Sequence, residues 1–476
     1  MIDVSNEQPY LLAADGLREP YITLSHCWGN GQPLTTTRST LETRMKGMPM
    51  PTLPKMFRDA VLITRQLGIK YLWIDSLCII QDSEEDWSQE AARMGNVYRY
   101  AFLTLFVLDA TDCHQGILVP RSPVPPEYAK LGKAGSSYAM TSLVRNKEDI
   151  FKASPLCHRA WALQERLLSP RIIYYSVEEF FWECLVCSAR EGSVTIKPYR
   201  PAKYSHARYE CADVKNRLVI PHGDSPSLPI SPSSDWHIIV VEYTRCYLTK
   251  PTDKLPALAG LASIFQANTG FTYLAGLWKE DIRDGLLWFV GSHGDQGVRH
   301  SEFSNPGPSW SWASSRYPVL YVTVTGSNDS PMRTVSNIKF VDYTITHNVS
   351  NPMSDLLDAS ITIQSEYKNL SYSSNAGGSY VYDGKIRGNV FLDRIEDYTP
   401  ERKPCTVLWI ADRELCTPNW KEANAGQMLQ VFVWSYFLVL VQDTRVEGSW
   451  RRIGLGRVSR RRGLFNGSMR AEFRLV

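Results

Sequence analysis

The order of apolar and polar segments between Tyr21 and Leu108 constrains the fold of this chain more than any other feature. An apolar run ending at Ser25 is followed by a loop, a helical pattern, a second apolar run ending just before Asp75, another helical pattern and a third apolar run. Consecutive strands that run in the same direction need a crossover helix between them. The order therefore predicts an α/β fold, with a parallel sheet flanked by helices.

Local signals give these elements their expected bounds. Pro54 suits the first turn of a helix, and Gly68 suits its end because glycine adopts the left-handed conformation without strain. The run 70–74 is too short for a helix and suits a buried strand. A second helix follows the acidic segment 82–86, whose charge favours the positive end of the helix dipole, and 102–108 is the third expected strand.

The apolar periodicity also predicts which residues meet. We expect Leu24, Ile74 and Leu105 on adjacent parallel strands, with Trp87 packed beneath them. The apolar positions of the first helix are Phe57, Ala60, Val61, Thr64 and Leu67. Those of the second helix are Trp87, Ala91, Met94 and Tyr98.

The same segment resembles the heterokaryon incompatibility (HET) domain of fungal proteins. The motifs that carry the resemblance are SHCWG at 25–29, LPKMFRDA at 53–60, YLWIDSLCIIQD at 71–82 and RAWALQERLLSPRIIYYS at 159–176. The region that commonly follows this domain is resembled by DKLPALAGLA at 253–262, YLAGLW at 273–278 and PSWSWAS at 308–314. The resemblance implies a part in non-self recognition and programmed cell death. It also implies a fold similar to the Toll/interleukin receptor (TIR) domain, some of whose members hydrolyse NAD.

The remainder of the chain falls into segments that differ in composition and in apolar pattern. Residues 110–150 are polar and predict a long insertion, of the kind that often covers a site. The expected elements after it are a helix at 159–168, strands at 171–175 and 179–184, a proline-rich connection at 192–235 and a helical stretch at 236–266. Short alternating strands after Pro308 indicate an antiparallel sandwich or barrel. We therefore expect a HET domain over 1–195, a linker and helical region over 196–305 and a β-rich domain over 306–476.

Reactive side chains follow the first two predicted strands, where parallel sheets bind their ligands. The residues expected at a ligand are Ser25, Cys27, Trp28, Gly29, Ser76 and Cys78, with His26 and Asp75 as catalytic candidates. His26 suits acid–base catalysis because its ordinary pKa lies near working pH. Asp75 is expected to be partly desolvated, so it either bonds the next turn or faces a ligand. Adjacent strand residues point to opposite faces, which argues against a Cys27–His26 dyad.

Glu90 is the third catalytic candidate, and two interpretations remain open for it. On its helix it suits a solvent-facing pair with Arg93. The resemblance to NAD-cleaving TIR domains instead implies a catalytic glutamate shortly after a tryptophan, here Trp87. A fixed carboxylate would stabilise the oxocarbenium-like state through which the glycosidic bond to nicotinamide breaks. We expect Glu90 and Asp75 to face one cavity with His26 at its rim.

Arg159 completes the candidate site, because its planar guanidinium suits a phosphate or a carboxylate. On the helix that follows it, we expect Trp161 and Leu168 to pack in the core, while Glu165 and Arg166 form surface pairs. The WSW motif at 310–312 and YLAGLW at 273–278 are expected in an interdomain core.

Composition excludes several classes of function. A formal net charge of +3 argues against nucleic acid as a partner, since phosphate binding needs a concentrated basic face. No run approaches the ~20 apolar residues of a membrane helix, and residues 1–21 lack the features of a signal peptide, so we expect a cytoplasmic protein. The ten cysteines are expected to be reduced. Cys184 and Cys187 form a CxxC without two further ligands nearby, so we expect no metal.

Three functions fit these observations. The first is an effector or regulator of incompatibility-type cell death that cleaves NAD or a related nucleotide, with NAD as substrate and no bound cofactor. The second is a non-catalytic module that acts by self-association or by binding another protein. The third is a small-molecule acid–base enzyme, a cyclase, lyase or isomerase, in which His26, Asp75 and Glu90 act on a metabolite held between two domains.

Overall fold

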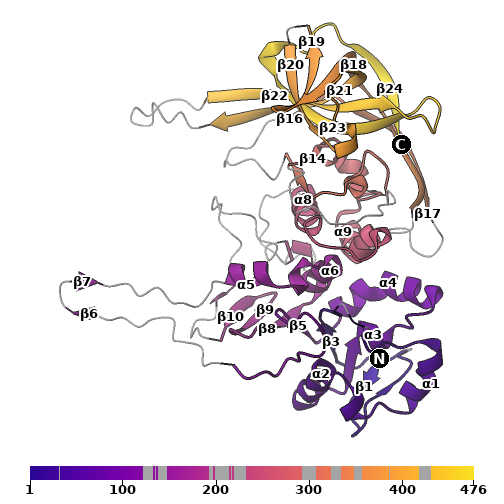
Figure 1. Ribbon diagram of the computed structural model, residues 1–476, viewed down its shortest axis with the longest axis vertical. Helices are drawn as coiled ribbons and strands as arrows, with labels where there is room; N and C mark the ends of the chain where they lie inside the picture. Colours follow the sequence, from indigo (N-terminus) through magenta and orange to yellow (C-terminus); the bar gives the residue numbers. More distant parts are fainter. Residues whose placement is uncertain are drawn as a thin grey trace.

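The computed structural model describes the chain except residues 15, 30, 32, 122–131, 134–135, 138–146, 192–196, 199–213, 216, 219–231, 292–306, 323–333, 348–355, 385 and 418–429. An α/β unit lies at one end of the molecule and a β-rich unit at the other, with helices α8 (Pro232–Tyr243) and α9 (Ala259–Thr269) between them (Figure 1). Residues 122–131, 134–135 and 138–146 of the predicted insertion and most of the proline-rich connection at 192–235 lie outside the described residues.

The α/β unit is built on a sheet of nine described strands, in the order β11-β10-β9-β8-β5-β3-β4-β1-β2. Its four central strands are parallel. They are β4 (Tyr71–Ile74), β3 (Tyr21–Ser25), β5 (Leu103–Val107) and β8 (Arg171–Tyr175). Leu24 pairs with Ile74 on one side and with Leu105 on the other, so the predicted parallel register is confirmed.

Antiparallel strands extend this sheet on both sides; of these, the sequence pattern predicted only β9, as the strand expected at 179–184. Beside β4 in the sheet lies β1 (Ile2–Asp3), and β2 (Tyr10–Leu11) lies beyond it at the edge. Beside β8 on the other side of the sheet lie, in order, β9 (Phe180–Cys184), β10 (Cys187–Arg190) and β11 (Lys197–Pro198). Strands of two residues carry too little periodicity to be recognised from sequence.

Helices cover both faces of the sheet. Helix α2 (Lys55–Gln66) buries Phe57, Ala60, Val61 and Thr64 as predicted, whereas Leu67 is exposed because the helix ends before it. Gly68 has a φ of +70° after that end. On the opposite face, α4 (Glu84–Arg99) begins at Ser83, which accepts a hydrogen bond from the Asp86 N–H. Helix α6 (Ala160–Leu168) lies beside α4, and Trp87 and Trp161 meet edge to face at 6.5 Å.

Several shorter described helices complete this unit. They are α1 (Arg38–Lys46), which buries no residue and was not predicted, the single turn α3 (Asp75–Cys78) and α5 (Lys147–Ala153). The strands β6 (Gly132–Lys133) and β7 (Ser136–Ser137) pair with each other.

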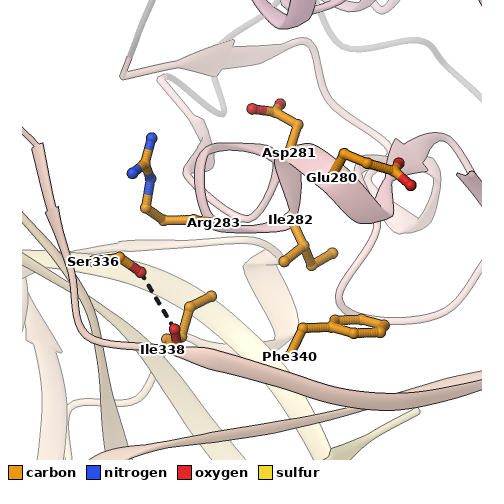
Figure 2. A pocket seen from close by; sticks show the side chains of 7 residues that line it. All are labelled: Glu280, Asp281, Ile282, Arg283, Ser336, Ile338 and Phe340. Atoms are coloured by element: carbon orange, nitrogen blue, oxygen red, sulfur yellow. Dashed lines mark hydrogen bonds between the residues drawn. The ribbon is translucent and has the colours of Figure 1, made fainter. Parts of the chain in front are cut away.

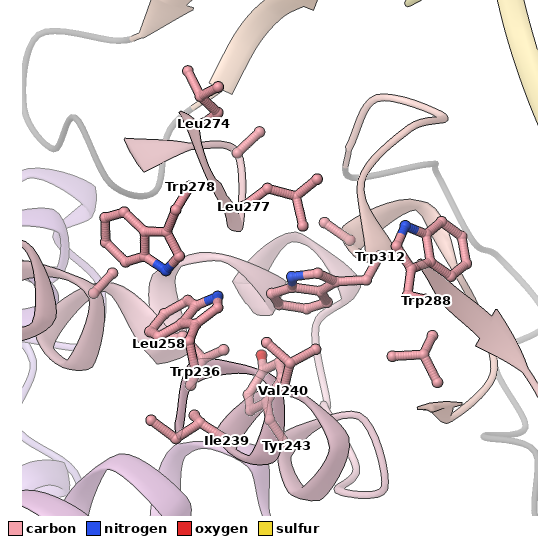
Figure 3. Close-up of a cluster of buried hydrophobic side chains, with 14 of the residues drawn as sticks. Trp236, Ile239, Val240, Tyr243, Leu258, Leu274, Leu277, Trp278, Trp288 and Trp312 are labelled. Atoms are coloured by element: carbon pink, nitrogen blue, oxygen red, sulfur yellow. The ribbon is translucent and has the colours of Figure 1, made fainter. Parts of the chain in front are cut away.

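The central region is a core of tryptophans. Trp236, Trp278, Trp310 and Trp312 are at most 1% exposed, so the expectation that the WSW and YLAGLW motifs are core is confirmed. Figure 3 shows the indoles of Trp236, Trp278 and Trp312 gathered in one cluster. The short elements around them are β12 (Tyr273–Leu274), β13 (Leu277–Trp278), α10 (Ile282–Gly285), β14 (Trp288–Val290) and β15 (Val319–Tyr321).

The C-terminal strands form a barrel, one of the two predicted arrangements. Pairing runs in a closed ring from β18 through β19, β20, β23, β22 and β21 back to β18. These strands are β18 (Leu356–Asn375), β19 (Gly378–Asp383), β20 (Ile386–Leu392), β21 (Lys403–Thr417), β22 (Gln430–Gln442) and β23 (Trp450–Ser459). The strands β16 (Thr334–Ser336), β17 (Lys339–His347) and β24 (Met469–Leu475) pair outside the ring.

Two details of the expected β region were wrong. Its strands are not uniformly short, since β18 spans 20 residues and pairs with four neighbours. The strand β15, expected in this region, instead pairs with β14 in the central region. Strand pairing thus crosses residue 305, just as β11 extends the first sheet past residue 195. The division at those two residues remains a prediction.

Candidate active site

A buried polar cluster lies at the carboxyl ends of β3 and β4. These strands are parallel and in register, so Ser25 and His26 after one lie beside Asp75 after the other. Side chains alternate along β3, so Ile22 and Leu24 face α2 while Ser25 faces α6. The sequence pattern therefore positions the first members of the cluster correctly.

Glu165 on α6 is the member that the sequence analysis missed. Ser25 Oγ donates a hydrogen bond to Glu165 Oε2, and the two residues are only 1% and 6% exposed. The predicted surface pair for Glu165 is wrong, because α6 is enclosed by the sheet, α4 and α9 and most of its residues are buried. An apolar periodicity cannot reveal a helix that has neighbours on nearly every side.

The protonation of Glu165 is set by this burial. Burial and the negative charge of Asp75 raise its pKa from 4.5 to about 7, against hydrogen bonds from Ser25 and Tyr98 and the charge of Arg159, which lower it. A carboxyl group with this pKa exchanges its proton near neutral pH. That is the range in which a general acid or base is most effective.

His26 is neutral at physiological pH. Burial lowers its pKa to about 4, although the charge of Asp75 acts to raise it. Its Nδ1 lies 4.0 Å from Asp75 Oδ1, and neither ring nitrogen has a hydrogen-bond partner within the described part of the chain. Its ring meets Phe57 edge to face at 5.2 Å. The neutral His26 ring can therefore polarise a bound group or accept a hydrogen bond, but it does not act as a cation.

Asp75 is where the cluster approaches the surface. Its side chain is 15% exposed. Oδ2 accepts a hydrogen bond from Trp28 Nε1 at 2.8 Å, and Oδ1 accepts one from the Ser76 N–H at 2.7 Å. Gly29 allows the turn that carries Trp28 over Asp75: its φ is +85°, and a Cβ there would lie 2.5 Å from Asp112 Cβ.

Arg159 joins the cluster from the start of α6, and its predicted ligand-binding role remains a prediction. Its Nη1 donates a hydrogen bond to the His26 carbonyl oxygen. Cys27 is buried, and burial raises the pKa of its thiol, so it is a poor nucleophile at neutral pH. Burial also raises the pKa of Cys78, and the buried Ser76 hydroxyl has no hydrogen-bond partner among the described residues.

Glu90 makes different contacts from the cluster. Its carboxylate pairs with Arg93 Nη1 at 3.5 Å, and its side chain is 22% exposed. Burial and the charge of Asp86 raise its pKa, whereas Arg93 and the N-terminal ammonium group of Met1 lower it. The same ammonium group acts on the Cys78 thiol. The structure thus brings His26 and Asp75 together with Glu165, whereas the ion pair of Glu90 is with Arg93 on its own helix.

A separate pocket of about 240 Å³ lies between the central region and the strands β16 and β17 (Figure 2). It is lined by Glu280, Asp281, Ile282, Arg283, Ser336, Ile338 and Phe340. Two of its carboxylates already have partners: Asp281 Oδ2 lies 2.8 Å from His237 Nε2, and Glu280 accepts from Thr272. None of the predicted site residues lines this pocket.

Comparison with known protein families gives a match over the segment that contains the cluster. Residues 21–165 match the family model described as heterokaryon incompatibility protein (HET). No curated protein and no solved structure gives a significant match. Within the described residues, no group of three or more potential metal ligands is present and no helix is long and apolar enough to cross a membrane.

Proposed function

We propose that this chain, whose residues 21–165 form a heterokaryon incompatibility domain, is an effector of incompatibility-type cell death that cleaves NAD or a related nucleotide. The observation that supports this proposal is the pair formed by Asp75 and Glu165 at the carboxyl ends of parallel strands. One carboxyl group reaches toward solvent, and the other is buried with a pKa of about 7. The same proposal includes a TIR-like fold for this domain.

The pair suits hydrolysis of an N-glycosidic bond. The C1′–N bond breaks with its electrons passing to the nicotinamide ring, which leaves as a neutral molecule and needs no proton. The Asp75 carboxylate, oriented by Trp28, stabilises the oxocarbenium-like state. Water then bonds to C1′, and its proton passes through the Ser25 hydroxyl to Glu165. The products are nicotinamide, ADP-ribose and one proton.

The test measures nicotinamide release by the purified full chain with NAD. Glu165→Gln and Asp75→Asn keep the side-chain size, so each should lower the rate at least about 100-fold while circular dichroism and Tm stay close to wild type. The wild-type rate should rise with pH through about 7 as Glu165 loses its proton. Glu90→Gln is the matched comparison on α4 and should leave the rate within about 3-fold.

Each alternative result has a distinct meaning. If Glu90→Gln abolishes release and Glu165→Gln does not, the catalytic carboxylate is Glu90, as the resemblance to TIR domains implies. If the wild type releases no nicotinamide above background in any oligomeric state, the hydrolase proposal fails.

A non-catalytic, self-associating module is the second candidate. It is favoured by the internal hydrogen bonds of Glu165 and Asp75, which already have the protein partners Ser25 and Trp28. Cell death that survives both Glu165→Gln and Asp75→Asn, together with self-association in light scattering, would support it. Conversion of another metabolite by the wild type, lost in both variants, would instead support a small-molecule acid–base enzyme.

A further inference from the structure

Two cysteines face each other at the turn between β9 and β10. Cys184 ends β9 and Cys187 begins β10, and only Leu185 and Val186 separate them. The two strands pair antiparallel with Glu183 opposite Ser188, and continuing this register places Cys184 opposite Cys187. Their Sγ atoms lie 3.6 Å apart.

This position suits a disulfide without a change of fold. Opposite residues in an antiparallel pair have Cα atoms about 4.5–5.5 Å apart, and a disulfide spans about 4.4–6.8 Å. Closing the bond requires the sulfur atoms to approach from 3.6 Å to about 2.05 Å, which side-chain rotation can supply. The turn itself is open to solvent, since Val186 is 72% exposed.

The local hydrogen bonds favour a thiolate on one sulfur. Burial acts to raise the pKa of Cys184, but hydrogen bonds from the backbone N–H groups of Val186 and Cys187 outweigh it and lower that pKa. The pKa of Cys187 is raised, chiefly by its hydrogen bond to Cys184. A hydrogen bond with the Trp182 side chain acts to lower the pKa of both thiols, but at Cys187 it is outweighed. These hydrogen bonds therefore favour Cys184 as the sulfur that loses its proton first.

Other cysteines in the described part of the chain provide a contrast. Cys27 and Cys405 are only 6% exposed, and burial raises the pKa of both thiols, to about 12 for Cys405. A buried thiol of this kind is inert, whereas a partly exposed thiolate beside a second thiol is the arrangement found in reactive pairs. Reactivity is therefore expected at the hairpin and not in the core.

We propose that Cys184 and Cys187 form a redox-active dithiol that is oxidised by small-molecule disulfides such as glutathione disulfide. The Cys184 thiolate attacks one sulfur of the external disulfide, whose S–S bond breaks, and one glutathione thiolate leaves. Cys187, once deprotonated, attacks the Cys184 sulfur of the mixed disulfide and displaces the second glutathione. Two electrons pass from the cysteines to the external disulfide, and the two thiol protons end on the two glutathione molecules.

The test uses the full chain equilibrated in glutathione buffers of increasing oxidation, quenched in acid and treated with a maleimide. One tryptic peptide, 172–190, contains both cysteines, so mass spectrometry reads both at once. We expect this peptide to change from two maleimide adducts to an internal disulfide, with the two-electron slope of a dithiol. Two maleimide adducts at every buffer ratio would overturn the proposal, as would glutathione adducts without the internal disulfide.

Variants assign the two roles. Cys187→Ser should accumulate a glutathione adduct on Cys184, whereas Cys184→Ser should react with glutathione disulfide at least about 10-fold more slowly. Cys405→Ser, in the barrel, should leave the titration of the 172–190 peptide unchanged. Equal reaction rates for Cys184→Ser and Cys187→Ser would contradict the assignment of Cys184 as the attacking thiolate.

Discussion

Glu165 and His26 belong to one buried cluster, yet burial shifts their pKa values in opposite directions. Glu165 moves from 4.5 to about 7, so folding stability from this group is present below about pH 4.5 and is lost as the pH rises through about 7. His26 moves from 6.5 to about 4, so its contribution is present above about pH 6.5 and is lost as the pH falls through about 4. The two pH dependences oppose each other between pH 4.5 and 6.5.

Removing the titratable group of Glu165 should leave the pH dependence of stability that comes from His26 visible on its own. In Glu165→Gln, only the His26 dependence remains, so we expect the free energy of unfolding to fall by about 3 kcal/mol relative to wild type between pH 7 and pH 4. Urea unfolding at several pH values measures this difference. Glu42→Gln, on the exposed helix α1, is the control and should follow the wild-type profile. Parallel profiles for wild type and Glu165→Gln would contradict the opposed pair.

The turn between β12 and β13 organises the tryptophan core of the central region. The Gly276 carbonyl accepts hydrogen bonds from Trp236 Nε1 at 2.9 Å and from Trp312 Nε1 at 2.8 Å. Gly276 has a φ of +95°, and a Cβ there would lie 2.9 Å from the Trp312 indole. The turn thus holds together three segments that are far apart in the sequence.

Gly276→Ala should be strongly destabilising for two separate reasons. The positive φ costs about 1–2 kcal/mol for alanine, and overpacking against Trp312 adds about 1–3 kcal/mol. Gly270 at the end of α9 has a φ of +71°, and a Cβ there would have no described atom within 4 Å, so Gly270→Ala should show the first cost alone. Denaturant unfolding followed by tryptophan fluorescence compares the two variants. Equal losses would mean that contact with Trp312 contributes nothing.

Arg452 connects the barrel to the central region. It is 1% exposed on β23 and lies over the Trp288 ring at 3.6 Å. Its Nε donates to Asp393 Oδ2 at 2.9 Å, while Nη1 and Nη2 donate to the carbonyl oxygens of Leu286 and Trp288 at 2.8 Å and 2.5 Å. One continuous hydrophobic core also runs from Trp73 in the first sheet to Leu475 in the last strand.

Arg452→Met should therefore destabilise both regions together. Breaking a buried ion pair leaves Asp393 without its cation and costs about 3–5 kcal/mol. Differential scanning calorimetry should show the central and barrel transitions shifted downward together. Lys46→Met breaks the exposed pair with Glu42 and should cost less than about 1 kcal/mol. A lower transition for the barrel alone would show that Arg452 does not couple the two regions.

The sequence alone determined the central part of the α/β sheet. Period and turn residues specify strands and helices locally, and the crossover rule then sets the parallel register of Leu24, Ile74 and Leu105. The same reasoning located Ser25, His26 and Asp75, because residues that follow neighbouring parallel strands meet at one edge. Only a local pattern and one general rule were needed.

The tertiary structure decided the rest. Glu165 comes 140 residues after Ser25, and its burial depends on α4 and α9 enclosing α6, which no local periodicity records. Barrel closure likewise depends on β18 pairing with β21, a partner distant in sequence, as well as with its hairpin neighbour β19. Such contacts are selected by packing of the whole chain, so the burial that sets the pKa of Glu165 becomes visible only once the chain is folded.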